Sequence, residues 1–327
     1  MQTSEKLNEM LISDSEFAQK IGEIAARLDE IGQSGYFDSF DGAKMYYEYY
    51  PAEGATSNVV VIHGFTEFTK KFTEMIYYFT SLGSNVFIFD QRGHGLSYRQ
   101  VSDPELAHID SFDSYVKDFD EFINRIVIPR SNGLSCRLFA HSMGCAVGVL
   151  WMQKHPDFFK KAVLSSPLIY AVTGGVPLLI VKRFVTKELR RGESPEHSFR
   201  YTHGFDPNAD FSKSSDMSRA RFEYNLELRR RNRLYQNSAV TNGWLNESFK
   251  AGKRIIDRRA LGNIVTSVLI FSAGKDTVVL TSYHKKLCRR LKNARMILLP
   301  ESKHTPFTGT DETIKRYFTG IVDFYEE

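Results

Sequence analysis

The 327-residue sequence has only three cysteines, Cys136, Cys145 and Cys288. This odd number, within regular-looking segments, argues against a disulfide framework, so we expect buried thiols in a reducing compartment. No stretch approaches the ~20 apolar residues that span a bilayer. Residues 1–9 are polar and lack the apolar core of a signal peptide. We therefore expect a cytoplasmic protein, and the sequence leaves open a peripheral contact with the inner face of the membrane.

The sequence also lacks the motifs that usually accompany cofactors and nucleic acids. It contains no glycine-rich phosphate loop, no His/Cys spacing typical of a metal site and no recognised nucleic-acid-binding motif. Internal repeats and low-complexity segments are absent too. We expect no metal, no organic cofactor and no nucleic-acid partner. Any chemistry must then come from the side chains and backbone of the chain itself.

The net charge of +4 is small, but it is distributed unevenly. Residues 168–259 hold 18 Lys/Arg and 10 Asp/Glu, so this stretch is strongly basic while the remainder is mildly acidic. Such a segment faces an anionic partner, for example a membrane surface or a phosphate-bearing substrate. Alternatively, it is a solvated helical surface that is rich in arginine. The sequence leaves both interpretations open.

Short apolar segments alternate with amphipathic segments over most of the chain, which predicts a doubly wound, mostly parallel α/β sheet. Residues 13–31 begin with a capping box and carry apolar residues at helical spacing, which predicts a helix in an N-terminal extension. Residues 168–259 interrupt the alternation, and their apolar spacing predicts a helical insertion. The predicted units are an extension over 1–35, a core over 36–167 and 260–327, and an insertion over 168–259.

The segment Ala140–Gly144 is the first candidate for a catalytic site. It reads Ala-His-Ser-Met-Gly and lies between an expected strand and an expected helix. Small residues two positions before and after Ser142 are typical of a nucleophile elbow, a sharp turn that lifts the hydroxyl above the sheet. The same pattern also occurs in turns without chemistry. The interpretation therefore requires a base, an acid and an oxyanion hole elsewhere in the chain.

The position of each histidine relative to the strands selects the base. Sites in open parallel sheets form at the carboxyl ends of the strands, where His63, His94 and His304 lie. Only His304 follows a late strand and leaves room for the order Ser, Asp, His. Asp276 follows the strand predicted at 266–271, whereas Asp257 precedes it at the wrong end. The six remaining histidines lie elsewhere: His108, His141, His155, His197, His203 and His284.

These residues predict a triad in which each member has a distinct task. Ser142 attacks a carbonyl, His304 moves the proton, and Asp276 orients the imidazole and stabilises its cation. An oxyanion hole needs two backbone N–H groups near the serine. We expect them from Met143, directly after the nucleophile, and from Phe65, in the loop after the strand 58–62. Gly64 would let that loop approach the site.

On these motifs the chain resembles the α/β-hydrolase superfamily, and within it the monoacylglycerol lipase and lysophospholipase branch, also labelled serine aminopeptidase. The matching stretches are residues 63–67, 89–97, 140–144 and 272–276, and His304 with its following helix. Residues 218–222 and 243–245 resemble bacterial lysophospholipases. Two departures are Ala140 in place of the first elbow glycine and the Thr305-Pro306 pair after His304.

The resemblance implies an α/β-hydrolase fold with an eight-stranded sheet, in which residues 168–259 form a cap over the site. It also implies a serine hydrolase that cleaves esters of single-chain lipids, either lysophospholipids or monoacylglycerols. Asp90 and Arg92 would brace loops near the site. The alternatives are a carboxylesterase or peptidase for small soluble substrates, and a binding module on an inactive hydrolase fold. Substrate-binding residues, headgroup preference and oligomeric state are not specified by the sequence.

Overall fold

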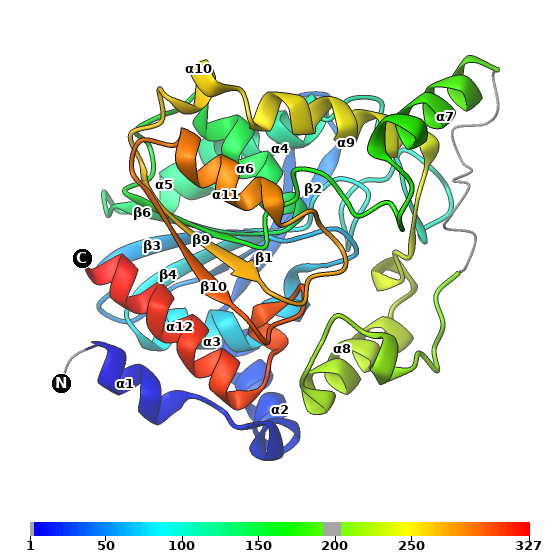
Figure 1. The fold of residues 1–327 in the computed structure, drawn as a ribbon. Helices are drawn as coiled ribbons and strands as arrows, with labels where there is room; N and C mark the ends of the chain where they lie inside the picture. Colours follow the sequence, from blue (N-terminus) through cyan, green and yellow to red (C-terminus); the bar gives the residue numbers. More distant parts are fainter. Residues whose placement is uncertain (1–2, 192–203) are drawn as a thin grey trace.

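The structure is a computed structural model that describes residues 3–191 and 204–327. His197 and His203, which the sequence places in the insertion, lie outside the described residues. The core is a twisted sheet with the order β1-β2-β4-β3-β6-β7-β9-β10 (Figure 1). The strands are β1 (Gln33–Asp38), β2 (Lys44–Tyr50), β3 (Ser57–Ile62), β4 (Ser84–Phe89), β6 (Cys136–His141), β7 (Lys161–Ser165), β9 (Ser267–Ala273) and β10 (Ala294–Leu299).

Six of the eight strands are parallel, and the antiparallel hairpin β1–β2 forms one edge of the sheet. The predicted mostly parallel, eight-stranded sheet is therefore confirmed. The hairpin turns at Gly42, whose positive φ of 81° suits glycine. Every residue of β3 and β4 is buried. This burial on both faces explains why these strands are almost continuously apolar in sequence.

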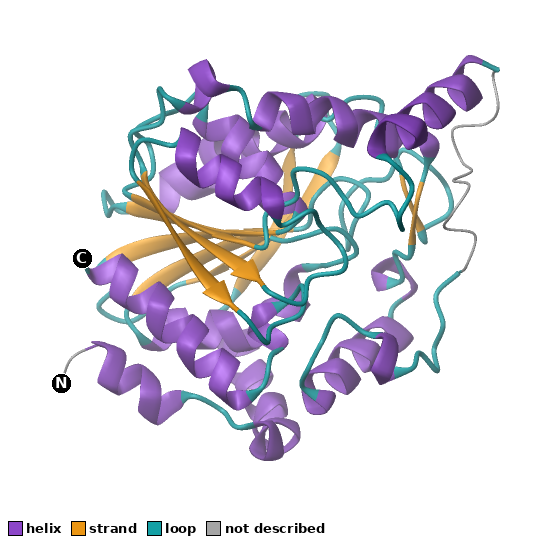
Figure 2. Cartoon of the chain, in the orientation of Figure 1, coloured by secondary structure: helices purple, strands orange, loops and turns teal. Residues whose placement is uncertain are grey.

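Helices cover both faces of the sheet (Figure 2). One face carries α3 (Thr73–Ser81) with the 3₁₀ turn Thr69–Phe72 before it, α12 (Asp311–Glu326), and the N-terminal helices α1 (Thr3–Met10) and α2 (Asp14–Ile31). The predicted apolar face of α2 packs inward through Phe17, Ile21, Ile24 and Leu28. The helix α1 is not predicted from the sequence, because its burial depends mainly on Leu7.

The opposite face carries α4 (Asp113–Phe122), α6 (Met143–Met152) and α11 (Ser282–Arg290). A π turn over Ile123–Val127 and the short α5 (Ile128–Arg130) extend α4. The helix α6 is buried along its whole length, as expected for a small, apolar segment. Cys136 and Cys145 are buried free thiols, whereas Cys288 is partly exposed. None of the helices in the described ranges is both long and apolar enough to cross a membrane.

Residues 168–191 and 204–259, the described part of the predicted insertion, are mainly helical. The elements are α7 (Leu178–Arg190), a 3₁₀ turn (Phe211–Lys213), α8 (Arg219–Arg231), a second 3₁₀ turn (Arg233–Tyr235), β8 (Ala239–Val240), α9 (Asn242–Ile255) and α10 (Arg258–Leu261). Two features were not predicted. The short β8 pairs with β5 (Leu106–Ala107) of the core, and α9 contacts α6, so this end of the insertion joins the helical layer.

Only part of the basic end of α8 is the expected exposed surface: Arg230 and Arg231 are exposed, whereas Arg229 is turned inward. Arg229 is largely buried, and its guanidinium donates hydrogen bonds to the carbonyls of Tyr235 and Asn237 at 3.1 and 2.6 Å. Burial lowers the pKa of Arg229 to about 10. Arg231 pairs with Glu227 at 2.7 Å. Part of the arginine-rich stretch therefore fastens the chain that follows α8 and does not face an external partner.

Candidate active site

Ser142 occupies a sharp turn between β6 and α6. Its backbone has φ 50° and ψ −114°, a conformation that residues other than glycine rarely adopt. Two main-chain hydrogen bonds hold the turn: Ser142 N–H donates to the Ser165 carbonyl at 2.9 Å, and Leu168 N–H donates to the Ser142 carbonyl at 3.0 Å. The turn places the Ser142 hydroxyl at the N-terminus of α6, where the helix dipole favours negative charge.

The structure brings the three predicted triad side chains together. Ser142 Oγ lies 2.9 Å from His304 Nε2, and His304 Nδ1 lies 2.8 Å from Asp276 Oδ2. A carboxylate only accepts hydrogen bonds, so the Nδ1 proton points toward Asp276. Nε2 is then left free to accept the Ser142 proton. This direction of hydrogen bonding is the one that a histidine general base requires.

Asp276 is held as a carboxylate at the end of β9. Its side chain is fully buried, and its second oxygen accepts the backbone N–H groups of Val278 and Val279 at 2.8 and 3.0 Å. Burial acts to raise the pKa of Asp276. The hydrogen bond and charge of His304, with those two amides, outweigh burial and hold the pKa below its usual value. Asp257 caps α10 instead, where it accepts from Ala260 N–H.

The predicted oxyanion donors flank the serine. Because β3 and β6 are adjacent, with Ile62 opposite Ala140, the loop after β3 lies beside the elbow. A Cβ added to Gly64 would come within 3.0 Å of the Cβ of Ser142, so only glycine permits this close approach. Within the described residues, neither Phe65 N–H nor Met143 N–H donates a hydrogen bond to another group. Both amides are therefore available to a ligand.

Glu67 is a further residue of this site, and sequence reasoning gave it no role. Its Oε2 accepts the Gly64 N–H at 2.6 Å, while its Oε1 pairs with Lys71 at 2.8 Å. Burial acts to raise the pKa of Glu67, but the charge of Lys71 outweighs burial and holds it at about 2. The carboxylate thus fixes the loop that carries Phe65. Glu67 belongs to the matching stretch 63–67, but the sequence did not show that it binds the Gly64 N–H and Lys71.

The other histidines near the strand ends have structural partners. His63 Nδ1 donates to the Gly64 carbonyl at 2.7 Å, and its Nε2 accepts Gln91 N–H at 2.9 Å. His94 Nδ1 contacts the Arg92 carbonyl at 3.0 Å. The His141 ring packs against that of His304, with 5.1 Å between the ring centroids. These contacts leave His304 as the histidine bonded to Ser142.

The Asp90–Ser97 loop is braced as the resemblance implied. Asp90 accepts backbone N–H groups from Thr69 and Leu96 at 2.7 and 2.8 Å. Arg92 is buried and donates to Asp118 and Asp41. These ion pairs join the loop to the β1–β2 hairpin and to α4. They stabilise the shell around the site and contact none of the three triad residues.

Comparison with known proteins places the chain in a family. A family model described as serine aminopeptidase, S33, matches residues 54–311. Lysophospholipase L2 of Escherichia coli strain K12 is 26% identical over 279 residues, which cover 82% of this chain and 79% of that protein. Monoglyceride lipase of Saccharomyces cerevisiae is 28% identical over 142 residues, 41% of this chain and 44% of that relative.

A solved structure confirms the α/β-hydrolase fold. A soluble variant of the Saccharomyces cerevisiae monoglyceride lipase, in complex with a substrate analog, matches with a TM-score of 0.70 and 18% identity. The match covers 90% of this chain and 95% of that chain. Because the family model spans most of the core and the insertion, the chain belongs to the serine aminopeptidase S33 family of α/β-hydrolases.

Proposed function

We propose that this protein is a serine hydrolase that cleaves carboxylic esters of single-chain lipids, with Ser142, His304 and Asp276 as its catalytic triad. The observation that carries the proposal is the continuous hydrogen-bond chain from Ser142 through His304 to Asp276. Hydrogen bonds that served only to stabilise the fold would not require a serine in a strained turn at their end. This also argues against a binding module on an inactive fold.

The reaction uses only groups of the chain and water. Ser142 Oγ attacks the ester carbonyl carbon while its proton moves to His304 Nε2. The carbonyl oxygen becomes an oxyanion that accepts hydrogen bonds from Phe65 N–H and Met143 N–H. The alcohol leaves with the proton from His304, and an acyl group remains on Ser142. Water then attacks that acyl group by the same route and releases the fatty acid.

The proposed substrate class is a lysophospholipid or a monoacylglycerol. Two features support it: similarity to lysophospholipase L2 extends over most of both chains, and an aromatic side chain of the insertion, Trp244, packs against Phe65. The Trp244 ring lies 5.0 Å from that of Phe65, between centroids, and its indole N–H donates to Tyr115 Oη. In this proposal residues 168–259 act as a cap whose apolar side shields an acyl chain from water.

A substrate panel tests this assignment. Lysophospholipids and monoacylglycerols with matched acyl chains would be compared with acetyl esters of the same alcohols. We expect kcat/KM to rise with acyl length, because each buried methylene contributes about 0.8 kcal/mol. A preference for acetyl esters would contradict the lipid assignment and favour a carboxylesterase. Cleavage of short peptides in place of both would favour the peptidase alternative.

We further propose that α7 docks on an anionic bilayer. Leu179 and Ile180 are 61% and 55% exposed. The exposed cations Arg183, Lys187 and Arg190 lie on the same helix, and its acidic residue Glu188 is buried. An apolar surface edged by cations complements an anionic membrane surface. This contact would bring the cap to the source of a lipid substrate.

Vesicle co-sedimentation tests the docking proposal. The double variant Leu179→Ser/Ile180→Ser should lose binding to vesicles that contain anionic lipid, but keep hydrolysis of a soluble short-chain ester. Leu298→Ser is the matched control, because Leu298 is 50% exposed on β10. Unchanged sedimentation of the α7 variant, or an equal loss in the control, would contradict docking through α7.

A further inference from the structure

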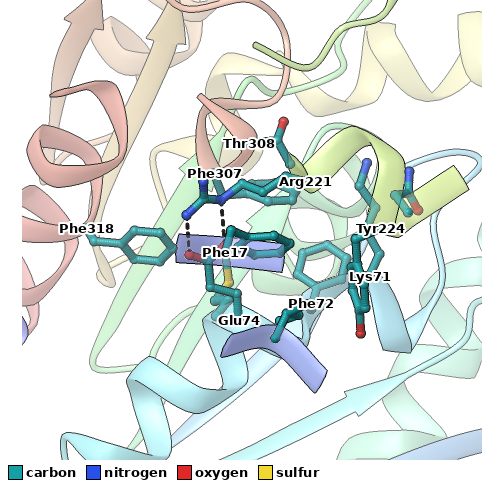
Figure 3. A pocket seen from close by; sticks show the side chains of 12 residues that line it. Phe17, Lys71, Phe72, Glu74, Arg221, Tyr224, Phe307, Thr308 and Phe318 are labelled. Atoms are coloured by element: carbon teal, nitrogen blue, oxygen red, sulfur yellow. Dashed lines mark hydrogen bonds and ion pairs between the residues drawn. The ribbon is translucent and has the colours of Figure 1, made fainter. Parts of the chain in front are cut away.

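Arg221 lies buried where α8 meets the N-terminal helices and α3 (Figure 3). Its guanidinium forms a bidentate pair with Glu74, with Nε–Oε2 at 2.8 Å and Nη2–Oε1 at 2.6 Å. Nη2 also donates to the Ile12 carbonyl at 2.8 Å, in the chain between α1 and α2. The guanidinium carbon lies 4.5 Å from the centroid of the Phe17 ring. We call this set of contacts the Arg221 anchor.

The first turn of α8 is tied to the same N-terminal extension by a second route. Ser218 caps the helix, since its Oγ accepts the Arg221 N–H at 3.1 Å. The same hydroxyl donates to the Asp14 carboxylate at the start of α2. Asp14 N–H in turn donates to Asp311 Oδ1 at 2.8 Å. The residues before α8 therefore cannot shift without breaking contacts to α2.

Residues 214–218, which come just before α8, also form hydrogen bonds with the loop that carries His304. Met217 N–H and Ser218 N–H both donate to the Thr308 carbonyl at 2.9 Å. Thr308 Oγ1 donates to Asp216 Oδ1 at 2.6 Å. On the other side of His304, Lys303 Nζ donates to the Ser214 carbonyl at 2.9 Å. The histidine loop is thus held at both ends by one short segment of the insertion.

The space between α2, α3, α8 and the loop that carries His304 is a packed interface and not a ligand pocket. It contains about 20 Å³ of free volume, which leaves no room for an acyl chain. Phe17 of α2, Phe72 before α3 and Phe307 of the histidine loop line it, together with the Arg221–Glu74 pair (Figure 3). Close packing of this kind transmits a displacement from one wall to the others.

We propose that Arg221 is a positioning residue for His304. By fixing α8 to α3 and to the N-terminal extension, the Arg221 anchor holds residues 214–218 against the histidine loop. The loop then keeps His304 Nε2 within hydrogen-bond distance of Ser142 Oγ. This inference rests on the proposed role of His304 as the base. It gives the N-terminal extension a task in the reaction, although none of its residues from 3 onward contacts the triad.

The test is the double variant Arg221→Met/Glu74→Gln, assayed in the full-length protein. Both partners are replaced because a single change would leave an unpaired buried charge. The concentration of active sites would be titrated with a fluorophosphonate probe. We expect kcat per titrated site to fall about tenfold or more, with KM within about twofold of wild type, because sub-ångström misplacement of a catalytic group slows the chemical step. The rate constant of probe labelling should fall in parallel.

A purely structural role would lower the melting temperature and the fraction of active sites, but not kcat per site. An unchanged kcat per site in the double variant would therefore overturn the proposal. Arg221→Lys, which keeps the charge but not the bidentate geometry, should restore part of the lost kcat. If the double variant does not fold, Thr308→Val decides, because it removes the Asp216 contact and preserves shape. A wild-type kcat for Thr308→Val would then overturn the proposal.

Arg219→Gln is the matched control. Arg219 lies on the same helix with a 68% exposed side chain, paired only loosely with Glu223 at 3.8 Å. Its replacement should leave kcat unchanged, and an equal loss of kcat would overturn the assignment to Arg221. Failure of the probe to label the wild-type protein would refute the proposed function itself. Normal labelling of wild type with an equally fast double variant would refute only the role of Arg221.

Discussion

Ser142 combines an uncommon backbone conformation with a hydroxyl directed at an imidazole. A non-glycine residue with positive φ costs on the order of 1–3 kcal/mol, and it persists only where surrounding contacts impose it. Here those contacts are the main-chain bonds to Ser165 and Leu168 on the neighbouring chain segments. The strain therefore has a function in this account, because it presents Oγ to His304 at the end of a helix.

Asp276→Asn tests how the imidazole is oriented. The neutral amide would no longer stabilise the imidazolium, and it could also bind the wrong tautomer. We expect kcat to fall by about 10⁴-fold, as in comparable triads, with a small change in KM. Steady-state kinetics with a soluble ester would measure this. A near-wild-type kcat would mean that a different carboxylate orients His304.

The members of the site differ in how far the sequence could predict them. Ser142, Asp276 and His304 each follow a recognisable strand. Because the carboxyl ends of parallel strands lie at the same end of the sheet, the sequence alone places the three residues together there. The same reasoning placed Gly64 and Phe65. Glu67 was missed because its role depends on the neighbouring loop conformation. Arg221 was missed because its partner Glu74 is 147 residues away in the chain.

The elbow also sets the distance between α6 and the sheet. A Cβ on Gly144 would lie 2.3 Å from the Ile62 carbonyl oxygen, which is a backbone clash. Ala140, in contrast, is fully buried with its methyl already accommodated. The departure from glycine at position 140 is therefore tolerated, while the glycine at position 144 is required by contact with β3.

Two variants at the elbow should consequently behave differently. Gly144→Ala should destabilise the protein by about 1–3 kcal/mol or more, because the helix must move away from β3. Ala140→Gly should keep activity within about twofold, with a small loss of stability from backbone entropy. Denaturant unfolding and ester hydrolysis would measure both. Equal stability of the two variants would contradict the packing described for the elbow.

Helices and strands were predicted correctly where burial leaves a clear spacing of apolar residues in the sequence. The buried strands at 58–62 and 266–271 and the amphipathic helix α2 were predicted, with boundaries off by a few residues. The first strand, β1, begins at Gln33, before the predicted start of the core at residue 36. The helix α9 was missed because its sequence mixes glycines and polar residues with buried Trp244 and Phe249. The pair β5–β8 was missed because two-residue strands have no periodicity to detect.

Across the whole molecule, buried neutral histidines link stability to pH. Burial lowers the pKa of His63 and His284 to about 4, and that of His94 and His141 to about 3. In the unfolded chain these histidines have pKa values near 6.5. Between about pH 4 and pH 6.5 the unfolded chain therefore binds more protons than the folded chain. Stability is therefore present above about pH 6.5 and is lost as pH falls toward 4. Burial raises the pKa of Asp90 to about 7 and also raises the pKa of Asp118, so two groups oppose the effect of the four histidines.

Chemical denaturation at pH 7 and pH 5 measures the linkage. The net effect of these groups should lower the free energy of unfolding at pH 5 by a few kcal/mol, at about 1.4 kcal/mol per pH unit for each net proton. His284→Gln should reduce the difference, because the amide does not titrate. An equal or higher stability at pH 5 would contradict the burial of neutral imidazoles at these positions.

The central claim is that Ser142 is a nucleophile activated by His304 and Asp276. Intact-protein mass measurement after treatment with a fluorophosphonate probe tests it most directly. The wild-type protein should gain a single adduct, and Ser142→Ala should gain none while keeping its circular dichroism spectrum. The same variant should lose on the order of 10⁶-fold in kcat. Equal labelling of wild type and Ser142→Ala would contradict the account.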